Sequence, residues 1–218
     1  MQTIYFIINQ SENHQSIIDG GGGASEFLFY LTIKSLSWHF NIVVYNRGST
    51  CKIDNIEYRF LPDNMNPDID NNSVVIVQRD FNMIIDLHKI NPSNKYILWS
   101  HDHLYGEFNH LSGNYNPLEI NEYFSKNNIQ IVSVSHFHKR NILFRLPNIN
   151  VIPIYNALFP EYFIKDSNIN FDKNTIIFAS NWVKGLDKVL NLGKHYYDRN
   201  KEFKLILIKP KYVINTIL

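Results

Sequence analysis

The sequence predicts an α/β protein with a doubly wound parallel sheet, and three observations support this fold class. Short apolar stretches recur along the chain, and most of them are apolar on both faces, as in buried parallel strands. Segments with the apolar spacing of helices lie between them. Polar clusters follow several of these stretches, at the carboxyl ends of the expected strands, which is where such sheets bind ligands.

The expected elements alternate along nearly the whole chain. Ser135 is expected to cap the fourth helix, because its hydroxyl can accept a hydrogen bond from a free N–H of the first turn. Residues 104–117 are expected to form a loop. The expected strands are 3–8, 41–45, 56–61, 73–78, 95–100, 130–134, 150–154, 175–180 and 203–208. The expected helices are 24–40, 81–90, 118–126, 136–144 and 184–197.

The elements divide the chain into a large and a small part. Residues 1–158 are expected to form a Rossmann-like domain, 159–174 a connector, and 175–218 the beginning or remnant of a second domain. A single βαβ unit buries too little core to be stable alone. The second part is therefore expected to pack on the first, to pair with another chain, or to begin a larger domain, and its strand edges make a homo-oligomer possible.

Composition narrows the class of protein. The net charge is +1 and the sequence pI is near 7.8, which argues against nucleic acid and anionic membranes as partners. A sugar, a nucleotide or another small molecule suits this balance better. The lone cysteine, Cys51, fits a reducing compartment, and no apolar stretch approaches the length of a membrane span. A cytoplasmic protein is expected.

Four consecutive glycines, Gly20 to Gly23, follow the first expected strand and precede the first helix. Glycine allows a close approach of ligand to backbone, and a helix N-terminus offers free N–H groups and a positive dipole. The stretch is compatible with a phosphate or nucleotide-diphosphate site. A flexible loop is the alternative, because residues 9–19 make this linker longer than most strand-to-helix turns. The glycine run by itself matches neither the dinucleotide fingerprint nor the P-loop.

Histidines follow two expected strands. His101-Asp102-His103 ends the strand 95–100, and His101 could act there as a hydrogen-bond donor or as a general acid or base. His136 and His138 follow the strand 130–134. Four imidazoles from neighbouring strands would suit zinc, as in a metallohydrolase, but no carboxylate-rich partner motif accompanies them. Polar residues that merely leave a buried strand are the third possibility.

A polar turn follows the strand 175–180. Ser180 and Asn181 precede Lys184 and Gly185, and a lysine beside helix N–H groups suits a diphosphate. A solvated lysine in an ordinary turn is the alternative.

The order of these motifs resembles the GT-B-fold glycosyltransferases, in particular the large retaining group called family 4. The resemblance covers nearly the whole chain and rests on five short motifs in the family's order. They are the Gly-Gly loop at Gly22-Gly23-Ala24-Ser25, the His-Asp strand end at Trp99-Ser100-His101-Asp102, the Val-Ser turn at Val134-Ser135-His136-Phe137-His138-Lys139, the turn Ile152-Pro153-Ile154-Tyr155-Asn156-Ala157, and Lys184-Gly185-Leu186-Asp187 after Ser180-Asn181.

This resemblance implies transfer of a sugar from a nucleotide-diphosphate donor to a glycan or other small-molecule acceptor, with retention of configuration and without a metal or other cofactor. It places His101 and Asp102 at the reacting sugar. His103, Ser135 and His136 are then expected on the acceptor side. The donor would be bound by Gly22, Gly23, Ser180, Asn181, Lys184 and Lys209.

Two departures from the family pattern matter. Asn181 stands where the family often has an arginine, and the family's paired-glutamate motif would lie beyond Leu218. The chain is therefore expected to be either the amino-terminal part of a longer transferase or a shortened, non-catalytic protein that binds a glycan or another protein.

Overall fold

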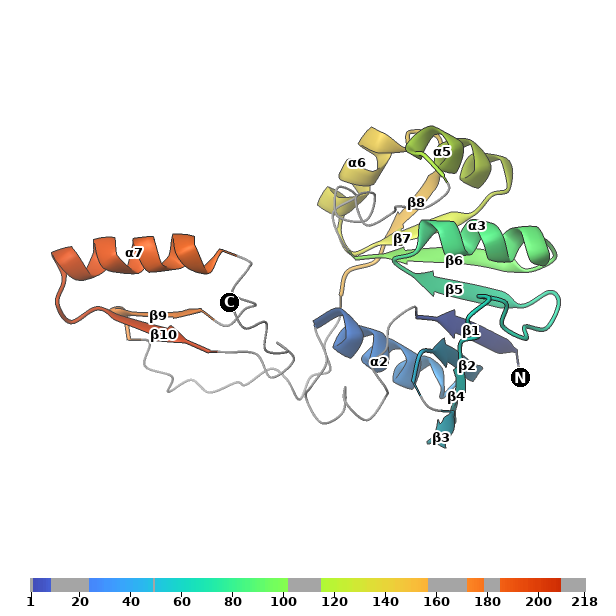
Figure 1. The fold of residues 1–218 in the computed structure, drawn as a ribbon, viewed down its shortest axis with the longest axis horizontal. Helices are drawn as coiled ribbons and strands as arrows, with labels where there is room; N and C mark the ends of the chain where they lie inside the picture. Colours follow the sequence, from blue (N-terminus) through green and yellow to red (C-terminus); the bar gives the residue numbers. More distant parts are fainter. Residues whose placement is uncertain are drawn as a thin grey trace. The chain divides into compact units, whose positions relative to one another are not determined.

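The structure is a computed structural model, which describes residues 2–8, 24–48, 50–101, 115–156, 172–178 and 185–208. The chain divides into two compact units, Met1–Leu158 and Phe159–Leu218. Each unit is an α/β arrangement with a parallel sheet, as Figure 1 shows. No helix in the described ranges is long and apolar enough to cross a membrane.

The first unit is built on an eight-stranded sheet in the order β3-β4-β2-β1-β5-β6-β7-β8. All neighbouring strands are parallel except β3 and β4. The predicted doubly wound fold class is therefore confirmed. The strands are β1 (Thr3–Ile7), β2 (Asn41–Asn46), β3 (Cys51–Ile53), β4 (Ile56–Phe60), β5 (Val74–Gln78), β6 (Lys95–Ser100), β7 (Gln130–Ser133) and β8 (Asn150–Pro153).

Helices cover both faces of this sheet, with α3, α5 and α6 on one face and α2 on the other (Figure 1). They are α2 (Ala24–Leu36), α3 (Phe81–Ile90), α5 (Pro117–Lys126) and α6 (His136–Arg145). Alternate strand residues therefore point into two separate cores.

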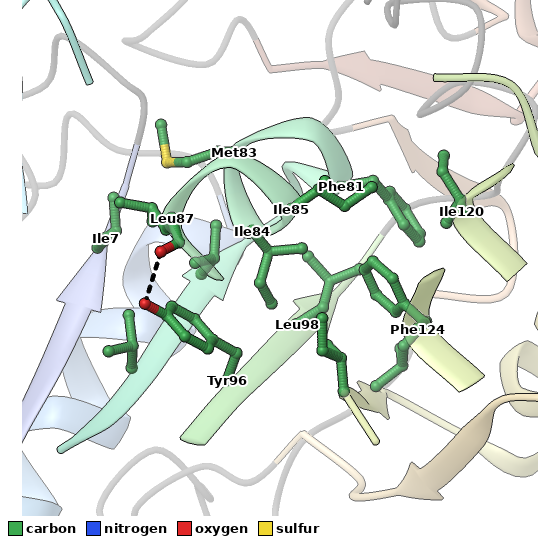
Figure 2. Close-up of a cluster of buried hydrophobic side chains, with 14 of the residues drawn as sticks. Ile7, Phe81, Met83, Ile84, Ile85, Leu87, Tyr96, Leu98, Ile120 and Phe124 are labelled. Carbon is green, nitrogen blue, oxygen red and sulfur yellow. Dashed lines mark hydrogen bonds between the residues drawn. The ribbon is translucent and has the colours of Figure 1, made fainter. Parts of the chain in front are cut away.

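The larger core lies beneath α3, α5 and α6. Phe81 of α3 and Phe124 of α5 are fully buried, with ring centroids 5.8 Å apart, and Figure 2 shows both close to Leu98 of β6. The phenol of Tyr96 donates a hydrogen bond to the Leu87 carbonyl at 2.9 Å, so its polar end is satisfied inside this core. The aromatic pair joins two helices to the middle of the sheet.

The smaller core lies beneath α2. Phe29 of α2 meets Phe6 of β1 edge to face at 5.3 Å and stacks on Trp99 of β6 at 5.9 Å. Ile33, one turn further along α2, is also fully buried. These contacts place the amino-terminal half of α2 over β1 and β6.

Three helices begin at side chains that cap free N–H groups. Asp80 accepts from the Met83 N–H at 2.9 Å at the start of α3. Asn116 and Glu119 form a reciprocal capping box at α5, with Pro117 at its first position. The Ser135 hydroxyl accepts from the His138 N–H at 3.0 Å, which confirms the predicted cap of α6.

One strand was missed by the sequence interpretation. β3 pairs antiparallel with β4 through a tight turn in which Asp54 has a φ of 52°. A short polar turn between two short strands is typical of a hairpin, so the signal was present at Asp54-Asn55. The hairpin adds one antiparallel edge strand and leaves the parallel part of the sheet as predicted.

The second unit is a βαβ arrangement of β9 (Thr175–Phe178), α7 (Leu186–Arg199) and β10 (Lys204–Leu207). A Cβ at Gly193 would lie 2.9 Å from Leu205 Cδ2, so a larger residue there would displace the Leu205 side chain where α7 meets β10. Tyr196 stacks on Phe203 at 5.6 Å. Ile177, Ile206 and Leu207 remain exposed, as the small core of a single βαβ unit predicts.

The buried phenol of Tyr5 in β1, which contacts Asp70 of the β4–β5 connection, makes the stability of the fold depend on pH in the alkaline range. Tyr5 is 3% exposed and donates to Asp70 Oδ2 at 2.6 Å. Burial, and then this hydrogen bond, raise the pKa of Tyr5 to about 12. The folded protein therefore favours the neutral phenol, and this contribution to stability is present below pH 10 and lost as the pH rises toward 12.

We expect the free energy of unfolding of the natural protein to fall more steeply between pH 10 and pH 12 than that of a Tyr5→Phe variant. Urea unfolding at a series of pH values measures both slopes. Replacement of the exposed Tyr155 by Phe is the control and should leave the slope of the natural protein unchanged. Equal slopes for the natural protein and Tyr5→Phe would contradict the assignment.

Candidate functional site at the carboxyl edge of the sheet

The strand order reverses direction between β1 and β5. The chain moves outward from β1 through β2 to β4, then returns to the other side of β1 and continues through β5, β6, β7 and β8. The chain therefore continues from β1 into α2 on one face of the sheet, and from β5 into α3 on the other face. Open α/β sheets bind ligands in the crevice at such a point. We call the side of the sheet where the parallel strands end the carboxyl edge.

Arg79 lies at this carboxyl edge, directly after β5. Its guanidinium donates to Ser25 Oγ at 2.8 Å and lies 3.6 Å from a carboxylate oxygen of Glu26. Ser25 in turn donates to Glu26 at 3.0 Å. The three side chains join the first turn of α2 to the end of β5, and Glu26 also lies where the helix dipole favours a negative charge.

The backbone of Arg79 is unusual for a non-glycine residue, with a φ of 62°. Its N–H donates to the Trp99 carbonyl at 3.1 Å, which continues the β5–β6 ladder by one residue. Asp80 follows at once as the cap of α3. The left-handed turn thus lets the chain pass from a buried strand into a helix and directs the Arg79 side chain toward α2.

His101, a predicted catalytic residue, follows β6 and contacts Trp99 through a tilted pair of rings. Its ring centroid is 4.6 Å from that of Trp99, which stacks on Phe29 of α2. His101 therefore lies on the face of the sheet covered by α2, together with the Arg79, Ser25 and Glu26 cluster. His101 is partly exposed.

Ser135 and His136, both predicted on the acceptor side, lie at the end of β7. The Ser135 hydroxyl caps α6, and the exposed His136 ring lies 5.9 Å from the ring of Tyr155. β6 and β7 are neighbours, so these residues share the carboxyl edge with His101. Within the described ranges, His101 contacts Trp99 and His136 contacts Tyr155, so the two histidines pack against different aromatic rings.

His138 lies on the other face of the sheet. It is 6% exposed, its Nε2 is 3.5 Å from Ser100 Oγ, and its Nδ1 is 3.5 Å from the Val134 N–H. His101 and His138 are thus separated by the sheet, which does not favour the four-imidazole hypothesis. Among the described residues, no three His, Cys, Asp or Glu side chains form a group that could hold a metal.

The remaining predicted site residues lie outside the described part of the chain. They are Gly22, Gly23, Asp102, His103, Ser180, Asn181, Lys184 and Lys209.

Sequence reasoning did not single out Gln78 or Arg79. Gln78 is the last residue of β5 and is 3% exposed. The sequence carried a weak signal, because the polar run Gln78-Arg79-Asp80 follows a continuously apolar strand. Asp80 alone explains such a run as a helix cap, whereas the side-chain contact with α2 depends on strand order.

The fold and this edge define a Rossmann-like α/β domain with a polar cluster at the point where the strand order reverses. No protein-family model matches the chain, and a comparison with curated proteins likewise found no match.

Proposed function

We propose that this chain is a glycosyltransferase of the GT-B type, or its amino-terminal portion. It would transfer a sugar from a nucleotide-diphosphate-sugar donor to a glycan or other small-molecule acceptor, with retention of configuration. The observation that carries the proposal is the placement of His101 and Arg79 at the carboxyl edge where the strand order reverses, beside the first turn of α2. Ligands of open α/β sheets bind at this point.

In this proposal His101 is the group nearest the reacting sugar. Its ring contacts that of Trp99, so an imidazole already positioned at the end of β6 would hydrogen bond to a sugar hydroxyl with little ordering cost at the moment of reaction. Asp102, next in sequence, would face the reacting sugar with His101, and His103, Ser135 and His136 would lie on the acceptor side.

The donor phosphates are assigned to residues of two kinds. Gly22 and Gly23 would allow close approach of the donor to the backbone before α2. Lys184 and Lys209 would supply positive charge, with Ser180 and Asn181 as hydrogen-bond partners. The donor is a substrate, and no metal or other cofactor is assigned.

The half-buried free thiol of Cys51 fits a reducing compartment, so we place the proposed enzyme in the cytoplasm, where nucleotide sugars would be its substrates.

A thermal-shift series with UDP, GDP and their sugar conjugates, first without and then with a divalent metal, tests the proposal. A ligand that binds only the folded state raises the melting temperature by mass action, by the equivalent of about 2.7 kcal/mol at a hundred times its dissociation constant. We expect a rise with one nucleotide class and no requirement for metal. A series with no rise for any nucleotide would contradict donor binding by this chain.

The same series separates the proposed transferase from a non-catalytic glycan-binding protein. Glycan acceptors would raise the melting temperature of both, but nucleotides would affect only the transferase. A rise that requires zinc or manganese instead would favour the metallohydrolase.

A further inference from the structure

Gln78 carries a buried carboxamide whose oxygen and nitrogen both lack a hydrogen-bond partner in the structure as described. The residue is 3% exposed, so water does not replace the missing partners at the surface. Leaving a buried amide unsatisfied costs about 1–3 kcal/mol. Folded proteins pair most such groups, so an unpaired one at a candidate site points to a ligand.

Strand alternation places this amide beneath the first turn of α2. Val75 and Val77 of β5 point into the core under α3, so Gln78 points to the opposite face, which α2 covers. Its partner on β6 is Trp99, which stacks on Phe29 of α2. Ser25 lies one turn before Phe29 on the same stripe of α2, and therefore over the end of β5.

Among the described residues, the charges next to Gln78 in the chain favour a neutral ligand over an anion. Arg79, the following residue, is already matched by Glu26, whose side chain is only 11% exposed. A phosphate placed here would meet the Glu26 carboxylate as well as the guanidinium. A hydroxyl group, in contrast, can donate to the Gln78 oxygen and accept from its nitrogen.

We propose that Gln78 binds the hydroxyl groups of an uncharged sugar ring at the carboxyl end of β5, beneath α2. The carboxamide supplies one acceptor and two donors, the Ser25 hydroxyl lies at the rim, and the Trp99 and His101 rings offer an apolar surface to the ring carbons. The proposal of a sugar site depends only on these side chains and not on the proposed enzyme activity. Its identification as the acceptor site, as distinct from the donor-phosphate position, rests on the proposed transferase function.

The test compares Gln78→Met with the natural protein. Methionine keeps the length of the side chain and removes both polar atoms. If Gln78 had a structural role, Gln78→Met would lower the melting temperature. If the amide serves a ligand, the variant should have an equal or higher melting temperature, because the unsatisfied buried atoms are removed. The matched control is Gln130→Met, since Gln130 begins β7 at the opposite end of the sheet.

Isotope-labelled protein is titrated by NMR with glucose, galactose, mannose and N-acetylglucosamine in turn, and separately with inorganic phosphate. We expect at least one sugar to shift the Gln78 side-chain amide signal, which is identified by its absence from Gln78→Met. The dissociation constant should rise about tenfold or more in Gln78→Met and stay unchanged in Gln130→Met. Phosphate should leave the Gln78 signal in place.

Three results would overturn the inference. They are the absence of sugar binding, equal sugar binding by Gln78→Met, and a phosphate response that depends on Gln78. Loss of several degrees in the melting temperature of Gln78→Met with unchanged binding would assign the amide to the fold. Sugar binding without any nucleotide response would keep this inference and remove the transferase proposal, so the two can fail separately.

Discussion

Replacing Phe124 by alanine is expected to lower the free energy of unfolding of the first unit by about 3–5 kcal/mol. Phe124 is fully buried between α5 and the sheet and contacts Phe81 of α3 at 5.8 Å. Its removal takes apolar surface out of the core and leaves a cavity that rigid strands on one side cannot close. Urea unfolding followed by tryptophan fluorescence measures the change in midpoint.

Phe144→Ala is the matched control for this substitution. Phe144 belongs to α6 and is 84% exposed, so the same truncation removes almost no buried surface. We expect a change within about 0.5 kcal/mol. If both variants had similar midpoints, Phe124 would not hold α5 against the sheet as the structure describes.

Replacing His101 by alanine is expected to reduce turnover by about 10²–10⁴-fold, the range for loss of a positioned acid, base or hydrogen-bond donor at a reacting centre. His101 contacts Trp99 at the carboxyl edge and is partly exposed. The assay is sugar transfer, with the donor that the thermal-shift series identifies. The fold should survive, because His101 is only partly buried.

His195→Ala is the control for His101→Ala. His195 is an exposed histidine on α7, with its ring 6.0 Å from Tyr196, and its loss should leave turnover unchanged. A melting temperature for each variant separates lost chemistry from lost structure. Normal turnover by a folded His101→Ala protein would remove His101 from the mechanism.

Much of the fold could be predicted from the sequence because buried strands and capped helices have local signatures. The helix from Phe81 and the strand from Lys95 begin and end where the sequence predicts. Asp80 and Ser135 cap the first turns of α3 and α6 with their own side chains. The residues that determine where these two helices begin therefore lie within a few positions of each other. β3 was missed because three residues carry too little pattern to stand out.

The candidate site could be predicted only in part. His101 was found because a histidine after an apolar strand is unusual and chemically useful. Ser135 was expected on the acceptor side as well as at the cap, and the structure uses its hydroxyl for the cap. Gln78 was not found, because a glutamine at a strand end acquires meaning only when its surroundings are known to contain no partner.

The sequence by itself determined most of the strands and helices, where several helices begin, and that the central strands are largely buried. Hydrophobic periodicity and caps act over a few neighbouring residues, so the chain carries them without reference to its fold. Only the tertiary structure decided that β5 lies beside β1, that α2 covers Gln78, and that Arg79 meets Ser25 and Glu26. Those contacts join residues more than fifty positions apart, and they depend on strand order, which no local pattern specifies.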